Sequence, residues 1–341
     1  MAFASAKWRS IAQSERLCRS SQAVSVAGQK AYIFGGELHP RSPVDNRIDI
    51  VSLEDDGGKK ANPLPDTTSA PTDAPTPRVG SPSTTIGERV YLFSGRGGLD
   101  MKPIEEEGAI WCHETRTAVW SLIRPADSTA SYPVGRSYHC IASGENDSIY
   151  IHSGCPESGR LSDLWVFNIS TRSWSELSSG PAPARGGASI AYASGKIYRM
   201  NGFDGTTEQG GALDVYDVAT GSWTTISFGP DGVQGPEARS VATLLALTIY
   251  GRQWLVTMFG ERDPSSLGHA GAGKMLSDVW AWDIGQSSWT QIAVAGNCPE
   301  PRGWFDASVS NEGSGEQAII VHGGLSEENT RLGDVWKLCF V

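Results

Sequence analysis

One pattern recurs along the whole chain, and it constrains the fold more than any single motif does. Each copy begins with an Arg followed by small and apolar residues, as in "GRSYHCIA" at Arg136 and "PRGWFDASV" at Arg302. An apolar run that ends in Gly follows, as in "IYIHSG", and a third run such as "DLWVFN" comes after a variable loop. In four copies a Trp then stands three residues before Leu or Ile. The six Arg residues that open the copies are Arg19, Arg78, Arg136, Arg185, Arg239 and Arg302.

Six copies of about 50 to 60 residues, each with four short strands, predict an all-β fold, a six-bladed β-propeller. The pattern resembles the kelch repeat, although the double Gly of that repeat is often a single Gly here. Gly after the second strand lets the backbone turn sharply near the crowded axis. We expect the recurrent Trp residues to fill the space between neighbouring blades. The recurrent Arg residues are interpreted as structural, bonding carbonyls or acids between blades.

The two ends of the chain complement each other. The last copy stops at Val341 after its third strand and lacks the Trp-containing strand. That strand appears at the other end as "KWRSI", from Trp8 to Ile11. We therefore predict that the N-terminal strand completes the sixth blade, which removes an open sheet edge. Residues 1–341 would then form one kelch propeller domain, with residues 54–77 as an exposed, Pro-rich connection.

Charge and composition exclude several classes of partner. The formal net charge is −10 and no Lys/Arg run exists, so nucleic acid and anionic membrane surfaces are not expected as partners. No apolar stretch approaches the roughly 18 residues of a membrane-spanning helix, and the N-terminus lacks the apolar core of a signal peptide. The six Cys show no CxxC spacing, which favours reduced thiols. These features predict a cytoplasmic protein.

One loop combines acids with a histidine. Glu261, Asp263 and His269 lie in "FGERDPSSLGHAGAGK", residues 259–274, after the second strand of the fifth copy. Carboxylate and imidazole together suit Fe(II), Mn(II) or Zn(II). The alternative interpretation is a turn with two solvated acids and a surface histidine.

Three further side chains are expected on the same rim of the propeller. Arg96 follows the Gly turn of the second copy, Tyr138 lies in "GRSYHC" of the third, and Trp304 lies in "PRGWFD" of the sixth. An Arg with aromatic neighbours can hold an anionic group while the ring faces contact an apolar tail. Packing between blades is the alternative role for Tyr138 and Trp304.

The region "FGERDPSSLGHAGAGKMLSDVWAWD…EPRGWFDASV…VHGGLSEENTRLGDVW" resembles the plant specifier proteins, as do "GRSYH", "RGGASIAYASGKIY" and "EARSV". The similarity covers essentially the full chain. Members of that family are six-bladed kelch propellers that need Fe(II). They act on the unstable aglucone that a thioglucosidase releases from a glucosinolate and divert it from isothiocyanate to nitrile, epithionitrile or thiocyanate. The resemblance therefore implies a small, anionic substrate and an iron cofactor.

The resemblance also assigns metal ligands, with one departure. Glu261 and His269 match the first and last members of the family's Glu-x3-Asp-x3-His iron motif. Ser265 stands at the middle position. Asp263, two residues earlier, is then the replacement ligand.

The remaining family positions concern the substrate. Arg96 matches the Arg that the family places near the aglucone sulfate, and Trp304 matches a substrate-pocket Trp. Tyr138 replaces a Phe, and Arg160 lies in the loop where the family has a further Arg. The resemblance thus implies catalytic roles for Arg96, Tyr138, Arg160 and Trp304.

These observations leave three functional hypotheses. The first is a lyase or isomerase that directs the fate of a reactive intermediate in specialised metabolism, with Fe(II) assistance. The second is a metal-free propeller enzyme that catalyses a rearrangement or cyclisation, and the third is a non-catalytic scaffold that binds a protein through its rim loops. An enzyme needs a concave pocket lined by Arg96, Tyr138 and Trp304, whereas a scaffold needs an exposed apolar or charged patch.

Overall fold

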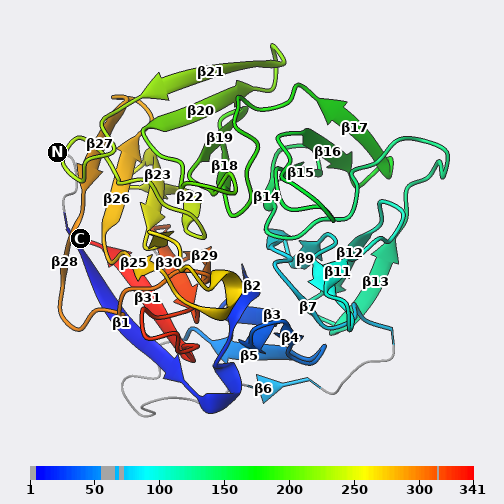
Figure 1. Ribbon diagram of the computed structural model, residues 1–341, viewed down its shortest axis with the longest axis horizontal. Helices are drawn as coiled ribbons and strands as arrows, with labels where there is room; N and C mark the ends of the chain where they lie inside the picture. Colours follow the sequence, from blue (N-terminus) through cyan, green and yellow to red (C-terminus); the bar gives the residue numbers. More distant parts are fainter. Residues whose placement is uncertain (1–4, 55–65, 69–72, 313–314) are drawn as a thin grey trace.

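The computed structural model describes residues 5–54, 66–68, 73–312 and 315–341, and it leaves the side chain of His269 undescribed. Six antiparallel sheets surround a central axis, as in a propeller (Figure 1). The predicted connection 54–77 falls largely on residues 55–65 and 69–72, which lie outside the described residues. No helix in the described ranges is long and apolar enough to cross a membrane.

The strands follow the order predicted from the repeats. Blade one contains β2 (Ser20–Ala27), β3 (Lys30–His39), β5 (Ile48–Ser52) and β6 (Asp66–Thr67), with β4 (Ser42–Pro43) added to β3. Blade two contains β8 (Ser83–Ile86), β9 (Arg89–Leu92), β12 (Ile110–Glu114) and β13 (Val119–Ile123). Blade three contains β14 (Cys140–Ser143), β15 (Ser148–His152), β16 (Leu164–Asn168) and β17 (Ser173–Leu177).

Blade four contains β18 (Ser189–Ala193), β19 (Lys196–Met200), β20 (Ala212–Asp217) and β21 (Ser222–Ser227). Blade five contains β22 (Thr243–Ile249), β23 (Arg252–Met258), β26 (Val279–Asp283) and β27 (Ser288–Gln291). Blade six contains β29 (Asp306–Asn311), β30 (Gln317–His322) and β31 (Asp334–Phe340). In each blade the first strand lies innermost.

The N-terminal strand β1 (Ser5–Gln13) joins blade six (Figure 1). It pairs antiparallel with β31, with Trp8 opposite Leu338, and the register shifts between Ser10 and Ala12. The short strand β28 (Ala293–Ala295) pairs parallel with the outer side of β1. Blade six therefore combines strands from both ends of the described chain.

Short elements occupy the loops of the rim. Strand β10 (Arg96–Gly97) pairs with β7 (Arg78–Val79) and β11 (Lys102–Pro103), and β24 (Glu261–Arg262) pairs with β25 (Lys274–Met275). The described residues also contain two 3-10 turns, η1 (Glu15–Leu17) and η2 (Gly268–Ala270). Of these elements, β10 and β24 contain the predicted site residues Arg96 and Glu261.

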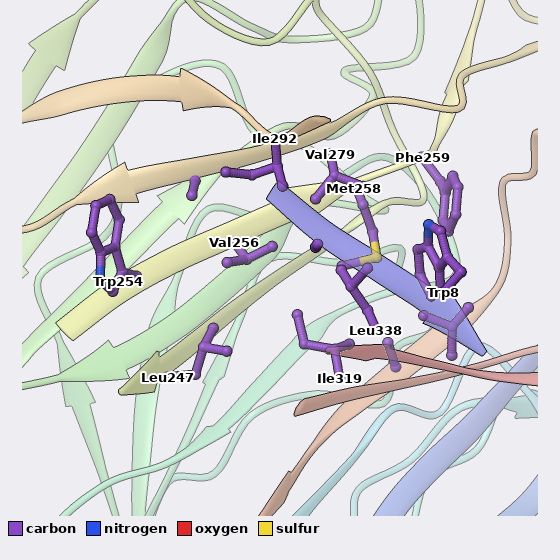
Figure 2. Close-up of a cluster of buried hydrophobic side chains, with 14 of the residues drawn as sticks. Trp8, Leu247, Trp254, Val256, Met258, Phe259, Val279, Ile292, Ile319 and Leu338 are labelled. Carbon is purple, nitrogen blue, oxygen red and sulfur yellow. The ribbon is translucent and has the colours of Figure 1, made fainter. Parts of the chain in front are cut away.

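Tryptophans pack between neighbouring blades, as predicted. In blade three, the indole of Trp174 donates a hydrogen bond to the carbonyl of Gly108 in blade two at 2.7 Å, and its ring meets Phe93 at 5.6 Å. In Figure 2, Trp8 lies beside Phe259 of blade five, and their rings stack with centroids 5.7 Å apart. Burial of these large rings stabilises the contact between adjacent sheets.

The recurrent arginines are structural, but they act within blades, so the expectation of bonds between blades was wrong. Arg136 is fully buried and makes a bidentate pair with Asp163 of the same blade, at 2.6 and 2.8 Å. It also donates to the carbonyl of Ser153. The equivalent ion pairs are Arg19–Asp49, Arg78–Glu106, Arg239–Asp278 and Arg302–Asp334.

Blade four departs from this arrangement. Register places Ala212 where blade three has Asp163. Arg185 bonds the carbonyls of Pro183 and Asn201, and the described residues give it no ion pair. Burial lowers the pKa of Arg185 to about 10. The fold therefore tolerates one buried arginine without an acidic partner.

Candidate functional site

Six equivalent residues form a ring around the axis. Each lies two positions after the recurrent Arg, and each has a left-handed backbone with φ between 45° and 60°. Each backbone N–H donates to the carbonyl of the preceding member, at 2.7 to 3.0 Å, so the bonds close into a circle. The members of this six-residue ring are Ser21, Gly80, Tyr138, Gly187, Val241 and Trp304.

The left-handed backbone is costly for four of these residues, because only Gly adopts it without steric penalty. Such strain persists where surrounding structure enforces it, and it often marks a functional site. Here the closed circle of hydrogen bonds supplies that enforcement. The repeated motif gave no sign of the ring, because the ring position holds a different residue in nearly every blade.

Two aromatic members of the ring meet across the axis. Tyr138 belongs to blade three and Trp304 to blade six, on opposite sides of the propeller, and their rings pack edge to face with centroids 5.2 Å apart. Tyr138 lies against Gly80, where an added Cβ would stand 3.0 Å from the phenol ring. We call Tyr138 and Trp304 the aromatic pair. Their contact crosses the axis, so packing between neighbouring blades does not explain it.

Hydrogen bonds position both rings. The hydroxyl of Tyr138 donates to the Ser21 Oγ at 3.5 Å, and burial raises the pKa of Tyr138. The indole N–H of Trp304 donates to Glu261 Oε2 at 3.1 Å. The aromatic pair is therefore tied to blade one on one side and to blade five on the other.

Glu261 is a buried carboxylate. Its side chain accepts from the backbone N–H of Gly273 at 2.6 Å as well as from Trp304. Burial raises its pKa above the ordinary value despite these bonds. The backbone of Glu261 bonds that of Ser240, one residue before the six-residue ring. The structure thus brings Glu261 to the aromatic pair.

The structure describes the side chain of Asp263, the second predicted metal ligand, but not that of His269, the third. The carboxylate of Asp263 is 76% exposed and lies 3.8 Å from the guanidinium of Arg262. The side chain of His269 lies outside the described part of the structure, although its backbone falls in η2. Within the described ranges no three His, Cys, Asp or Glu side chains form a group that could hold a metal ion. The site of Glu261, Asp263 and His269 stays a prediction.

A second carboxylate, missed in the sequence, lies near Glu261. Glu208 follows the second strand of blade four, and one of its oxygens is buried without a hydrogen-bond partner in the described residues. Burial raises the pKa of Glu208, and the negative charges of Glu261 and Asp263 raise it further. No local motif marks Glu208, because it meets Glu261 through the contact between two blades.

The predicted arginines lie on blades two and three. Arg96 donates to Ser137 Oγ and to the carbonyls of Met101 and Pro156, at 3.1 to 3.2 Å. Arg160 donates to the carbonyl of Gly159, and its Nε is buried without a partner among the described residues.

The positive charges of Arg96 and Arg160 both interact with the thiol of Cys155. Burial raises the pKa of Cys155, while the positive charges of Arg160 and Arg96 act in the opposite direction. Cys155 and Arg160 both lie against Gly186, and Arg96 bonds the carbonyl of Pro156, the neighbour of Cys155, so the two arginines lie on either side of this thiol.

An axial cavity of about 600 Å³ reaches the aromatic pair. Its lining begins at the six-residue ring and continues along the innermost strands to the hairpin turns at Gly28 and Gly87. Arg96 and Glu261 pair instead with Val79 and Ser240, just before the ring, and neither lines the cavity. We expected one pocket lined by Arg96, Tyr138 and Trp304. This cavity is lined by Tyr138 and Trp304 but not by Arg96, so for this cavity the expectation is wrong.

Comparison with known proteins identifies the repeat family. The family described as the KLHDC2/KLHL20/DRC7 Kelch-repeats domain matches residues 21–260. The chain is similar to the N-(sulfonatooxy)prop-2-enimidothioate sulfolyase of Thlaspi arvense, with 27% identity over 93% of this chain and 91% of that protein. It is 28% identical to Tip elongation aberrant protein 1 of Schizosaccharomyces pombe, over 56% of this chain and 16% of that protein.

A solved structure gives the same architecture. The structure of YjhT superposes with a TM-score of 0.69 and 14% identity, covering 96% of both chains. At that identity the likeness concerns the fold alone. The described sheets, the repeats and the family match agree with one another. The chain therefore belongs to this kelch-repeat family and has a propeller fold.

Proposed function

We propose that this protein is a lyase of the specifier type, which acts on a small sulfated substrate with help from a divalent metal. The observation that carries the proposal is the separation of charge around the aromatic pair. Arg96 and Arg160 lie together on blades two and three, whereas Glu208 and Glu261 lie near each other on blades four and five. An anionic group and a cation would each find opposite charge at the same rim.

The two arginines provide the anionic subsite. A guanidinium carries five N–H donors, and three groups of the protein accept from Arg96. These bonds fix the guanidinium in place and leave donors for a ligand, which favours bidentate binding of a sulfate-like group. The Thlaspi arvense relative is named for a substrate with a sulfonatooxy group.

The acidic side fits a metal ion such as Fe(II). One oxygen of Glu208 has no hydrogen-bond partner among the described residues, and the negative charge of Glu261 raises the pKa of Glu208. A bound cation would favour the ionised form of both carboxylates. His269 is the imidazole that the resemblance assigns. Because the Asp263 carboxylate is exposed, we propose Glu208, Glu261 and His269 as the ligands. When bound, the metal supplies a Lewis acid or a one-electron donor.

The side chains of the protein have the following roles in the reaction. Arg96 and Arg160 hold the sulfonatooxy group and stabilise the charge that develops on the departing sulfate as the N–O bond breaks. The aromatic pair contacts the apolar part of the substrate and keeps water away from it. The hydrogen bond from Trp304 to Glu261 links the apolar subsite to the acidic one.

The test measures how the protein directs product formation. N-(sulfonatooxy)prop-2-enimidothioate is released in situ from its thioglucoside by a thioglucosidase, under anaerobic conditions with Fe(II), and products are separated by gas chromatography. The wild type should divert product from isothiocyanate to nitrile, epithionitrile or thiocyanate. Arg96→Gln should lower the diverted fraction at least tenfold. Arg116→Gln, a change at an exposed arginine of the same blade, is the matched control.

Metal binding is measured separately. Anaerobic Fe(II) titration of the wild type should show binding that Glu208→Gln and His269→Ala each weaken at least tenfold, whereas Asp263→Asn leaves it unchanged. Equal binding by all four proteins would contradict the proposed ligands. Product diversion without any Fe(II) dependence would instead support the metal-free enzyme.

A partner-binding function is the second candidate, and exposed leucines favour it. Leu99 is fully exposed and Leu267 is 70% exposed, each in a loop that follows the second strand of its blade. Leu99→Ser combined with Leu267→Ser should abolish recovery of a rim-bound protein in affinity purification. Recovery that is unchanged in this variant would rule out a partner held through these two loops.

A further inference from the structure

The axial cavity has the size and shape of a ligand site. Its volume of about 600 Å³ falls within the usual range for small-molecule pockets, roughly 300 to 1,000 Å³. The aromatic pair lies at one end. Exposed Gly28 and Gly87 belong to the lining at the other end, so the mouth is at the surface opposite the rim. The cavity is thus reached independently of Arg96 and Glu261.

We propose that the axial cavity is a second ligand site, which binds a small organic ammonium ion with a compact apolar body. The proposal does not depend on the lyase function, because none of the described charged residues of the rim lines the cavity. It rests on three features of the described residues: one carboxylate without a cationic partner, an aromatic end, and a wall without Lys or Arg.

Asp306 is the carboxylate. It is the single charged residue among those that line the cavity in the described structure, and no charged side chain of the described residues acts on its carboxyl group. Its oxygens accept from the backbone N–H groups of Val24 at 2.7 Å and Ala307 at 2.9 Å. A carboxylate has about four acceptor positions, so capacity remains for a ligand. A carboxylate removed from water is stabilised in its ionised form by a cation.

The groups around Asp306 do not supply that cation. Strands β2 and β22, which flank β29, carry no titratable residue. On β30, the cross-strand partner is His322, whose Nε2 lies 3.0 Å from the carbonyl of Leu17. Burial lowers the pKa of His322 to about 3, so this imidazole is neutral. Burial also raises the pKa of Asp306 to about 7, as expected for a carboxyl without a cation.

The aromatic residues of the lining would contact the apolar part of the ligand. Tyr138 and Trp304 line one end of the cavity, and Tyr192, stacked on Tyr150 with centroids 5.7 Å apart, lines the wall. Aromatic faces attract organic cations as well as apolar groups. The described residues of the lining include no Lys or Arg, which disfavours anions. The cavity therefore selects against the sulfated substrates that suit the rim.

The test uses three probes of one shape and different charge: benzylammonium, benzyl alcohol and benzoate. Binding is measured at pH 8 by calorimetry and by ligand-observed NMR. Benzylammonium should bind the wild type at least tenfold more tightly than benzyl alcohol, and benzoate should not bind. Asp306→Asn should weaken benzylammonium at least tenfold and leave benzyl alcohol unchanged. Asp127→Asn, at an exposed acid, and Arg96→Gln, at the rim, should leave benzylammonium binding unchanged.

Two outcomes overturn the proposal. One is equal affinity for benzylammonium and benzyl alcohol in the wild type. The other is an ammonium preference that persists in a folded Asp306→Asn protein, as judged by circular dichroism. A measurement on the wild type alone covers the case in which the variant does not fold. Benzylammonium affinity should rise between pH 5.5 and pH 8 as Asp306 ionises, and a flat profile refutes the role of this carboxylate.

Discussion

The ion pairs within the blades permit an internal comparison, because five blades have the pair and one lacks it. In Arg136→Met, the Asp163 carboxylate loses both guanidinium contacts, at 2.6 and 2.8 Å, and keeps the indole N–H of Trp165 at 2.9 Å. Its side chain is only 18% exposed, so water replaces little of what is lost. Removing one partner of a buried pair costs about 3–5 kcal/mol. We expect a loss of that size in the free energy of unfolding.

Arg185→Met in blade four is the matched control. Arg185 occupies the same place in its repeat and bonds two carbonyls, but no carboxylate of the described residues forms an ion pair with it. The substitution therefore removes hydrogen bonds worth roughly 1 kcal/mol each and also removes a charge that is costly to bury. We expect a loss of about 0–2 kcal/mol. The difference between the two variants isolates the contribution of the carboxylate.

Guanidinium chloride unfolding, followed by tryptophan fluorescence, measures both losses. A further variant, Arg136→Met with Asp163→Leu, should recover part of the stability, because it removes the stranded carboxylate. Equal losses in Arg136→Met and Arg185→Met would refute the reasoning. In that case the carbonyl bonds and the packing of the side chain, rather than the ion pair, would hold the blade.

Three further predictions concern other parts of the molecule. Because the folded protein holds the Asp306 proton more tightly than the unfolded chain does, the wild type should lose stability between about pH 4 and pH 7. The melting temperature of Asp306→Asn, relative to that of the wild type, should therefore be higher at pH 8 than at pH 5. The same difference in melting temperature at pH 5 and at pH 8 would contradict this. Gly80→Ala should cost about 1–3 kcal/mol more than Gly87→Ala in denaturant unfolding, since both glycines have φ near 60° but only the Cβ at Gly80 meets Tyr138. Trp8→Ala should cost about 3–5 kcal/mol, and a loss below 1 kcal/mol would show that β1 contributes little to blade six.

The sequence predicted the strands well because each depends on a local pattern that is repeated. The Trp-containing strands, the Gly turns and the third strands such as "DLWVFN" fall where the repeats place them. The structural role of the recurrent arginines was also predictable, since they recur by position. The predicted partners in neighbouring blades were wrong, because the acid lies at or just before the start of the third strand of the same blade. The number of residues between the Arg and this acid differs from blade to blade, so no spacing rule links the two.

The candidate site was predicted only in part. The order of strands in the repeats placed Glu261, Arg96 and Trp304 on one rim, and the structure brings Glu261 and Trp304 into contact. The electrostatic interaction between Glu208 and Glu261 depends on how blades four and five pack against each other. The exposure of Asp263 depends on the direction of its loop, which the many glycines and small residues of that segment leave undetermined in the sequence.

By itself, the sequence determined the number of blades, the order of their strands and the positions of the repeated Arg and Gly residues. These features follow from short-range periodicity and from the backbone freedom of Gly. Only the tertiary structure decided that Tyr138 and Trp304 meet across the axis, and that Asp306 lines a cavity where the described residues place no cation beside it. The reason is physical: such contacts join residues from different blades, and closure of the ring sets their distance and direction.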